Sequence, residues 1–431
     1  MDSRAYTALA RFGLGRRGVE PLPADPAAWL AAQLGPAAAP EVPPGGADAA
    51  AAFAALEEAR RNRPPPGQQG PLRLIYEAEV AALADRGLAT DQPFRERLVR
   101  FWANHFTVSI RAGRVAPFVG DFVRTAIRPN ATGRFADMLL AVMRHPAMLL
   151  YLNQAGSVGP NSPAGMRTGR GLNENLAREC LELHTVGADA GYTQADVTSF
   201  ARLLTGWGVQ RDPPDVGFRF HPAAHEPGEQ TLLGRTFPDG EAGGVEALRF
   251  LAGHPATHHH LAAKLVQHFV ADDPDPGDVR AVEAVLRDTG GDLSAAALAA
   301  TRLPGAWTPL AKLRPPQDFA IAALRAADLS PERRPPLPGI AAGLGQPWFA
   351  APAPNGWGDR AADWSGPEAV LRRVDWAYGF GGRDDLPEPD AMAESSLGPL
   401  LRPATLTAIR RAGSRRDATA LLLTSPEFQR R

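Results

Sequence analysis

The chain has 431 residues and a formal net charge of −1, and 44% of its residues are hydrophobic and 22% charged. These values are typical of a globular protein, and they exclude the global basic field that attracts nucleic acid. The single cysteine, Cys180, excludes an intramolecular disulfide framework and a cysteine-rich zinc module. No apolar run approaches the roughly 18 residues that span a bilayer, so we expect no transmembrane segment.

The first residues, MDSRAYTALARFGLGRRG, contain neither the apolar stretch nor the small-residue cleavage site of a signal peptide. The sequence as given therefore predicts a cytoplasmic protein. The alternatives are a leader that was removed and export together with a partner.

Lysine is rare in this chain. Of the 46 Lys and Arg residues, only Lys264 and Lys312 are lysines. Codon bias in a GC-rich genome explains the excess of arginine and fits the abundance of Ala, Gly and Pro. Such bias converts dispensable lysines to arginine, whereas a site that needs a compact ammonium group keeps its lysine. Each lysine is therefore a candidate for a specific role, with neutral retention as the alternative.

Residues 4–34 are predicted to form two short helices, the second with Asp25 as N-cap and Pro26 in its first turn. An Ala/Pro/Gly-rich linker with one short helix at about 48–61 follows. From residue 71, helical patterns recur between short Gly/Pro breaks, over 71–85, 92–105, 115–128, 134–149, 173–187, 193–206, 244–252, 255–271, 276–288, 292–302, 315–327, 366–379 and 403–412.

Strand-like alternation is almost absent, and its one candidate is Gly217–Phe220, paired with Thr231–Leu233 as a small hairpin. The Gly- and Pro-rich stretches 156–172 and 331–362 are predicted as loops. The sequence therefore predicts an all-α fold, a multi-helix globular domain with long Gly/Pro-rich loops and at most one small β-hairpin. We expect four parts: an N-terminal helical segment (1–34), the linker (35–70), a helical core carrying the His/Glu motifs (71–330), and a loop with C-terminal helices packed on that core (331–431).

The strongest local signal for polar chemistry is the motif LNENLARECLELHTVG. On a helix, its residues Asn175, Glu179 and Glu182 fall at i, i+4 and i+7, so they form one polar stripe. His184 follows near the helix end and points to a different side. One interpretation is a surface helix with intrahelical ion pairs. The other makes Glu179 and Glu182 paired carboxylates that bind a metal or share a proton.

Two further segments carry single histidines of interest. In RLVRFWANHFTVS, His105 lies on an aromatic face, where a hydrogen-bonded core residue is the alternative to a functional one. In FRFHPAAHEPG, Pro222 and Pro227 argue against a helix, so a loop would have to deliver a ligand. His225 is the preferred candidate there.

The motif GHPATHHHLAAKLVQHFV is rich in histidine and contains Lys264, one of the two lysines of the protein. Lys264 and His268 lie at i and i+4 on one helix face. The adjacent residues His258–His260 point to different sides of a helix and cannot all converge.

The stretch QPWFAAPAPNGWGD concentrates aromatic residues and proline, as is typical of a pocket wall or a binding lip. Trp348, Asn355 and Trp357 are its candidate binding residues. The sequence contains no GxSxG, HExxH or GxxxxGK[ST] motif, no GxGxxG in strand-turn-helix context, and no ExxH pair, which argues against a di-iron bundle.

Several segments resemble the bacterial domain-of-unknown-function family DUF1800, and together they span essentially the whole chain: FWANHF, NENLARECLELHTVGADAGYTQADVTSFARLLTGW, FHPAAHEPGEQTLLGR, GHPATHHHLAAKLVQHFVADDP, APAPNGW and LLLTSPEFQRR, after a short match around ARFGLGRRG. The resemblance implies a helix-rich protein without an agreed activity. It also implies genes that often neighbour those of a family similar to sulfatases and alkaline phosphatases. Cys180 and the run His258–His260 depart from the family pattern, so we assign no role to them. The matching residues are His105, Asn175, Arg178, Glu179, Glu182, His184, His225, His254, Lys264 and His268.

The leading hypothesis is an enzyme, or an inactive relative of one, with a His/Glu site on a helical scaffold. The cofactor is unknown; a divalent metal is chemically reasonable, and it would activate water or polarise a phosphoryl or carbonyl group. The candidate metal ligands are Glu179, Glu182, His184 and His225. The candidate catalytic residues are Glu179, Glu182, His105 and Lys264.

The rival hypothesis is a non-catalytic helical scaffold for a co-expressed sulfatase- or phosphatase-like partner. In that case the His and Glu side chains form a buried polar network that fixes helix packing. The partner would bind at the loop that carries Trp348 and Trp357. A third hypothesis is a cell-surface polymer binder that uses the same tryptophans.

Overall fold

The computed structural model describes residues 3–35, 46–62, 64, 65 and 67–431. Of the predicted linker 35–70, residues 36–45, 63 and 66 therefore lie outside the described residues. Within the described ranges, helices account for most of the chain, and the strands form two separate two-stranded sheets. The predicted mainly α class is confirmed.

The N-terminal third supplies the helices that support the centre of the molecule. Asp25 accepts hydrogen bonds from the backbone N–H groups of Ala27 and Ala28, so the predicted N-cap is confirmed. Arg11 is buried and donates to the carbonyl of Phe269 over 2.8 Å, which attaches this end of the chain to a distant helix. The helices are α1 (Ser3–Thr7), α2 (Pro26–Ala32), α3 (Ala49–Arg61), α4 (Pro71–Ala89) and α5 (Pro93–His105).

The middle third contains shorter helices than its sequence pattern predicts. The predicted helix 134–149 divides at His145, because Pro146 restricts the preceding residue to extended backbone, with φ −72° and ψ 135° at His145. The predicted loop 156–172 contains a helix of its own. The helices are α6 (Val119–Phe122), α7 (Phe135–Arg144), α8 (Pro146–Tyr151), α9 (Pro163–Thr168), α10 (Asn175–Glu179) and α11 (Gln194–Leu203).

The strands form two hairpins, where the sequence predicted at most one. The predicted pairing of Gly217–Phe220 with Thr231–Leu233 is wrong, because each segment pairs with a nearer neighbour. Strand β1 (Trp207–Gln210) pairs antiparallel with β2 (Gly217–Phe220), and β3 (Gln230–Leu232) pairs antiparallel with β4 (Arg235–Phe237). Leu233 and Gly234 both have positive φ, which gives the tight turn that closes the second hairpin.

The last part of the chain is helical to its end and includes helices that the sequence pattern missed. Helix α17 lies in the predicted loop 331–362, and α19, α21 and α22 lie in segments without a clear period. The helices are α12 (Glu241–Ala252), α13 (Pro255–Phe269), α14 (Pro276–Thr289), α15 (Leu293–Arg302), α16 (Pro316–Ala327), α17 (Leu337–Gly343), α18 (Pro367–Gly381), α19 (Pro389–Leu397), α20 (Pro403–Arg410), α21 (Arg415–Thr424) and α22 (Pro426–Gln429).

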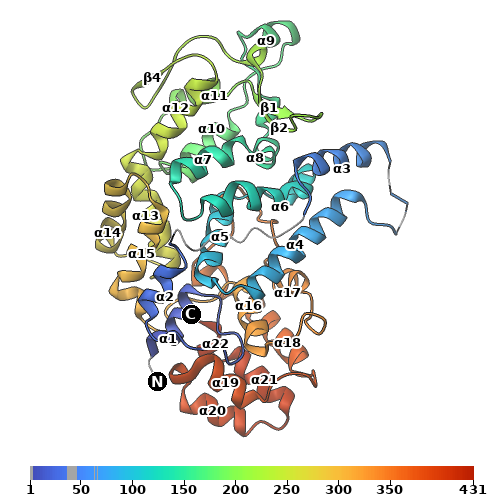
Figure 1. The fold of residues 1–431 in the computed structure, drawn as a ribbon, viewed down its shortest axis with the longest axis vertical. Coiled ribbons are helices and arrows are strands. Elements are labelled where there is room, and N and C mark those ends of the chain that lie inside the picture. Colours follow the sequence, from blue (N-terminus) through green and yellow to red (C-terminus); the bar gives the residue numbers. More distant parts are fainter. Residues whose placement is uncertain (1–2, 36–45, 63, 66) are drawn as a thin grey trace.

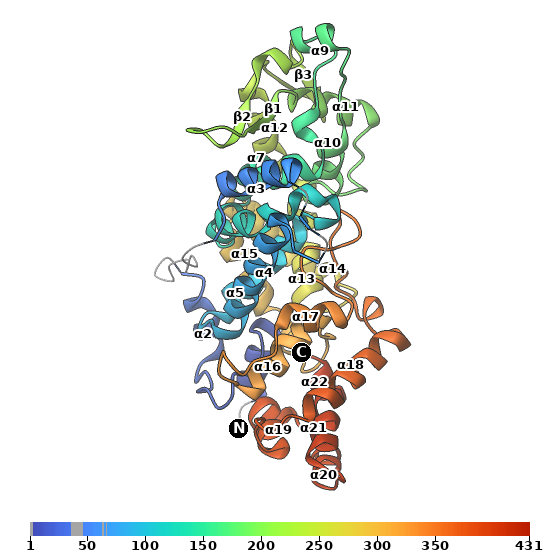
Figure 2. The ribbon, with the colours of Figure 1, turned by 90° about the vertical axis from the view of Figure 1, so that its right-hand side faces the viewer.

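The molecule is elongated, with the hairpins at one end and α18–α22 at the other (Figures 1 and 2). Helices α5, α13 and α16 lie between these ends, and one cluster of buried apolar side chains extends through all of these parts. The last residue, Arg431, pairs with Lys312 through two backbone hydrogen bonds of 2.7 and 3.1 Å. In the described part of the chain, no helix combines the length and the apolarity that crossing a bilayer requires.

Candidate functional site

A cavity of about 290 Å³ lies against α5, α13 and the segment that leads to α18; we call it the central cavity. Polar and charged side chains dominate its lining, which is unusual for a site so deep in a helical protein. It is lined by Arg97, Arg100, Phe101, Asn104, His105, Lys264, Gln267, His268, Pro315, Gln317, Asp318, Gln346, Asn355, Trp357, Gly358 and Asp359.

Helical spacing explains why the lining residues of α13 meet at this cavity. Lys264, Gln267 and His268 lie at i, i+3 and i+4, so they share one face of the helix. Pro255 stands in the first turn, and His254 caps the helix start by accepting a hydrogen bond from the N–H of Ala256. The shared face predicted for Lys264 and His268 is confirmed.

The loop that carries Asn355 and Trp357 is fixed to α5 by a pair of hydrogen bonds. The side chain of Asn104 donates to the carbonyl of Trp357 over 2.9 Å and accepts from its N–H over 2.8 Å. Gly356 has φ +79°, and a Cβ atom on it would lie 2.5 Å from the carbonyl oxygen of Asn104. Only glycine therefore allows the loop to approach α5 this closely.

We expect Gly356→Ala to lower the free energy of unfolding by more than about 1 kcal/mol, because alanine tolerates neither the positive φ nor the close approach. Urea unfolding measures this. The control is Gly339→Ala in α17, where no atom lies within 4 Å of the added Cβ and alanine favours the helix. Equal stability of both variants would contradict the described loop geometry.

His268 and Asp359 form a hydrogen-bonded pair at the cavity wall. The His268 Nδ1 atom lies 2.6 Å from the Asp359 Oδ2 atom, while the buried Nε2 atom has no hydrogen-bond partner among the described residues. Burial lowers the pKa of His268 to about 4, against the opposing effect of the carboxylate, so the ring is neutral at neutral pH. With its proton on Nδ1, the ring keeps a free lone pair on Nε2, which is the arrangement of a carboxylate-oriented general base.

Two basic side chains contact Asp359 in addition to His268. Arg431 approaches its Oδ1 atom to 3.5 Å, and Lys312 donates to its backbone carbonyl over 2.7 Å. Although burial opposes this, the hydrogen bond from His268 and the charges of Arg431 and Lys312 hold the pKa of the Asp359 carboxyl group below the usual range. The side chain is therefore an anion that orients His268.

The ammonium group of Lys264 has no hydrogen-bond or ion-pair partner among the described residues, although its side chain lines the cavity. Burial lowers its pKa, and the charge of Asp359 opposes this only in part. Lys312, in contrast, is fully buried and contacts the carboxylate of Asp272. Both lysines that the sequence analysis singled out thus lie near Asp359, but only Lys264 is free to bind a ligand.

Three histidines pack beside Lys264. His105 Nε2 lies 3.2 Å from the carbonyl oxygen of His184, and His260 Nε2 lies 3.1 Å from that of Leu183. Burial lowers the pKa of His184 to about 3 and that of His260 to about 4, and it holds the pKa of His105 well below the usual range. These rings are therefore neutral, and of the three only His105 lines the central cavity.

A buried cluster of charges closes the cavity near α16. Asp318 lies 2.6 Å from Arg97 and 3.4 Å from both Arg100 and Arg431. These three guanidinium groups hold the pKa of its carboxyl group far below the usual range. Three positive charges thus face one carboxylate, which leaves the region with an excess of positive charge.

Glu179 and Glu182, the predicted centre of the site, are not among the residues that line the central cavity. Both side chains are half-buried, and Glu182 hydrogen-bonds to Tyr192. Burial, followed by the charge of Glu182, raises the pKa of Glu179. The helix continues after Glu179 as a π-helical turn, Cys180–His184, which places His184 in the interior. Neither of its ring nitrogens has a hydrogen-bond partner among the residues that the structure describes.

His225 forms hydrogen bonds with backbone groups in the hairpin region. Its Nδ1 atom lies 2.8 Å from the carbonyl oxygen of Thr205, and its Nε2 atom accepts from the N–H of Gly240 over 2.9 Å. Among the residues that the structure describes, no three His, Cys, Asp or Glu side chains are grouped so that they could hold a metal ion. No three of the four predicted metal ligands are therefore grouped in this way, and His225 is already bonded on both ring nitrogens.

The predicted binding loop divides between two cavities. Asn355 and Trp357 line the central cavity, whereas Trp348 is 7% exposed and lines a neighbouring one together with Trp357. Asp318, Asp359 and Arg431 were not among the candidate residues predicted from the sequence, although Asp359 ends the stretch QPWFAAPAPNGWGD. They are far from one another and from α13 in sequence, and only the fold brings them together.

The family model described as "Protein of unknown function (DUF1800)" matches residues 7–430, which is nearly the whole chain. No curated protein and no solved structure matches it. The match agrees with the resemblance carried by the FWANHF segment of α5 and the histidine-rich segment of α13, both of which border the central cavity. The chain therefore belongs to the DUF1800 family of proteins of unknown function.

Proposed function

We propose that the central cavity binds a small molecule by its oxyanion group, and that a side chain of the cavity removes a proton from that molecule or from a water molecule beside it. Lys264 binds the oxyanion, and His268, oriented by Asp359, acts as the base. The observation that carries this proposal is the pairing of an unpartnered ammonium group with an imidazole whose outer nitrogen is also unpartnered, in one cavity. Buried polar groups without partners are rare in proteins, so the outer nitrogen of His268 requires an explanation, and a ligand in the cavity supplies one.

The charges around the cavity favour an anion over a cation. The two carboxylates of the lining already have partners, since Asp318 pairs with Arg97, and Asp359 contacts Arg431 and accepts a hydrogen bond from His268. Lys264 remains uncompensated, and a bound oxyanion would supply the hydrogen bonds and the charge that it lacks. In a desolvated cavity such a contact is stronger than it is in water.

The neutral imidazole gives the site its chemistry. His268 Nε2 can accept a proton from a hydroxyl group, a water molecule or an acidic C–H bond, and Asp359 then stabilises the imidazolium ion. Lys264 would hold the oxyanion in place and stabilise negative charge that develops beside it. The proposed function is thus acid–base catalysis on a small oxyanion-bearing substrate.

Inorganic phosphate is a direct probe of the oxyanion site. At constant ionic strength, phosphate should raise the Tm of the wild-type protein, because a ligand that binds only the folded state stabilises it. Lys264→Met should abolish this increase. The control is His259→Asn on the exposed side of the same helix, where His259 pairs with Glu283, and this variant should respond like the wild type. An unchanged response of Lys264→Met would refute the role of Lys264.

A further inference from the structure

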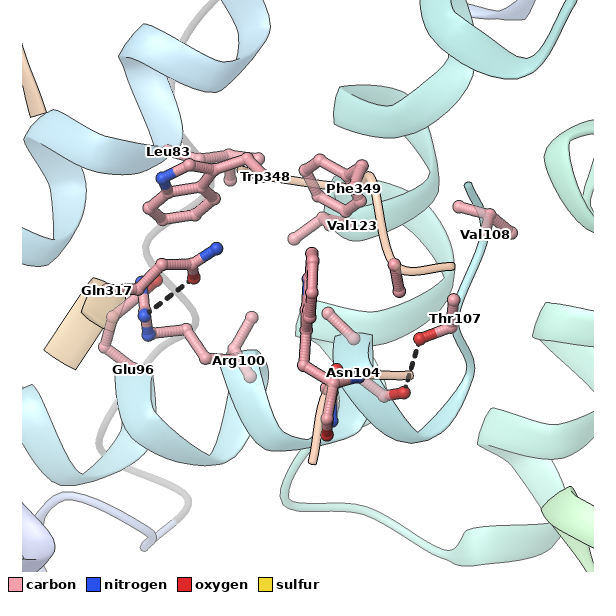
Figure 3. Close-up of a pocket in the computed structure, with 14 residues that line it drawn as sticks. Leu83, Glu96, Arg100, Asn104, Thr107, Val108, Val123, Gln317, Trp348 and Phe349 are labelled. Atoms are coloured by element: carbon pink, nitrogen blue, oxygen red, sulfur yellow. Dashed lines mark hydrogen bonds between the residues drawn. The ribbon is translucent and has the colours of Figure 1, made fainter. Parts of the chain in front are cut away.

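A second cavity, of about 70 Å³, lies on the other side of Trp357 and has mainly apolar walls; we call it the apolar cavity. Figure 3 shows Trp348 and Phe349 on one side of it, Val123 behind, and the side chains of α5 below. Four residues line both cavities: Arg100, Asn104, Gln317 and Trp357. The two cavities are therefore neighbours with a common boundary.

The boundary carries polar atoms that the protein leaves without partners. One guanidinium nitrogen of Arg100 donates to Gln317 over 3.1 Å, and the group lies over the ring of Trp348 at 4.8 Å (Figure 3). Its other terminal nitrogen, Nη1, is buried without a hydrogen-bond partner among the described residues, as is the indole nitrogen of Trp348. Mainly apolar walls with a few placed polar groups are the usual composition of a small-molecule pocket, and these two donors are available to such a ligand.

The backbone around the apolar cavity is held in place from several sides. Phe349 has φ +49°, a conformation that is strained for an aromatic residue, and its carbonyl accepts from the N–H of Ile110 over 2.7 Å. Tyr76 donates to the carbonyl of Trp348, and Ser109 to that of Ala351, each over 2.8 Å. The cavity is thus preformed, and the strain at Phe349 is maintained by its neighbours.

We infer that the ligand is amphipathic: an oxyanion at Lys264 joined to a compact apolar group, such as one ring or a short branched chain, that occupies the apolar cavity. This inference rests on the proposed function and adds the substrate class to it. The apolar cavity has room for a group of several carbon atoms but not for a long chain. A substituent acceptor atom near the boundary would satisfy Arg100 and Trp348.

A comparison of the dissociation constants of phenyl phosphate and inorganic phosphate tests whether the ligand carries an apolar group. The wild-type protein should bind phenyl phosphate at least about tenfold more tightly, since burial of a few carbon atoms gives that factor or more. Phenyl sulfate and benzoate, measured alongside, would identify which oxyanion the site prefers. Equal binding of phenyl phosphate and inorganic phosphate would overturn the inference while leaving the proposed function intact.

The matched variant is Ala103→Phe, because Ala103 lines the apolar cavity but not the central one. The added ring should fill the apolar cavity, so the tenfold preference should disappear while inorganic phosphate binds as before. Should this variant fail to fold, Ala103→Leu fills less space and should reduce the preference. A preference that survives in a folded variant would overturn the inference, and failure of both probes to bind the wild type would remove the proposed function with it.

Discussion

Replacing Asp318 by alanine is expected to lower the free energy of unfolding by about 3–5 kcal/mol, because it leaves buried guanidinium groups without their carboxylate. Arg97 and Asp318 are 3% and 8% exposed, so the loss of the carboxylate leaves the Arg97 guanidinium group charged in a largely desolvated position. Arg100 and Arg431 contact the same carboxylate and would repel Arg97 in its absence. Urea unfolding at pH 7 measures the loss.

The pH dependence of this loss has a defined sign. The Asp318 carboxyl group has a lowered pKa in the folded state, so its stabilising contribution is present above the unfolded-state pKa of about 3.9 and decreases as the pH falls below that value. The difference between wild type and variant should therefore be smaller at pH 3 than at pH 7. Asp288→Ala is the control, since the exposed pair of Asp288 with Arg287 should contribute at most about 1 kcal/mol. Similar losses from both substitutions would show that the Asp318 cluster is not buried as described.

Replacing Lys264 by methionine is expected to raise the free energy of unfolding of the unliganded protein by about 1–3 kcal/mol, since it removes a desolvated cation that lacks a partner. The same substitution should abolish oxyanion binding. The lowered pKa of Lys264 means that the unfolded chain binds more protons between that pKa and about 10.4, so wild-type stability rises with pH in this window. The gain from Lys264→Met should therefore be smaller at pH 10 than at pH 7.

Lys312→Met is the matched control, because it is the same substitution at the other lysine of the chain. Lys312 contacts the Asp272 carboxylate and donates to the Asp359 carbonyl, so its removal should lower the stability. Opposite signs at the two lysines would separate a functional lysine from a structural one. A loss of stability in Lys264→Met would mean that Lys264 is a packing residue and would count against the proposed site.

Capping and helical-spacing rules correctly predicted features of the fold that depend on a few adjacent residues. The cap at Asp25 and the shared face of Lys264 and His268 follow from the chemistry of a few adjacent residues. The break at His145 follows from the same chemistry, since Pro146 acts on its neighbour, but the helical period of the flanking residues concealed it. The hairpin pairing differs from the prediction because Leu233, the last residue of the segment predicted as a strand, forms a turn with Gly234, and the chain then pairs back on itself.

The site depends on contacts between distant segments, and the sequence revealed only some of its members. His105, Lys264, Asn355 and Trp357 were predicted and line the central cavity, although they were assigned to different roles. Asp359 reaches His268 across 91 residues, and no spacing rule predicts such a contact. The motif around Glu179 was predicted to be the centre of the site because its carboxylates are regularly spaced. Helical spacing, however, shows only that side chains share a face of the helix, and not which part of the protein that face contacts.

The most direct test of the central cavity as an oxyanion site is the NMR spectrum of the protein labelled with ¹³C at the Cε atom of lysine. The chain has two lysines, so two signals are expected, and Lys264→Arg identifies which belongs to Lys264. We expect the Lys264 signal to titrate below the ordinary pKa of about 10.4 and to move when inorganic phosphate is added, while the Lys312 signal does not respond to phosphate. A Lys264 signal that titrates near 10.4 and is unaffected by phosphate would contradict the account.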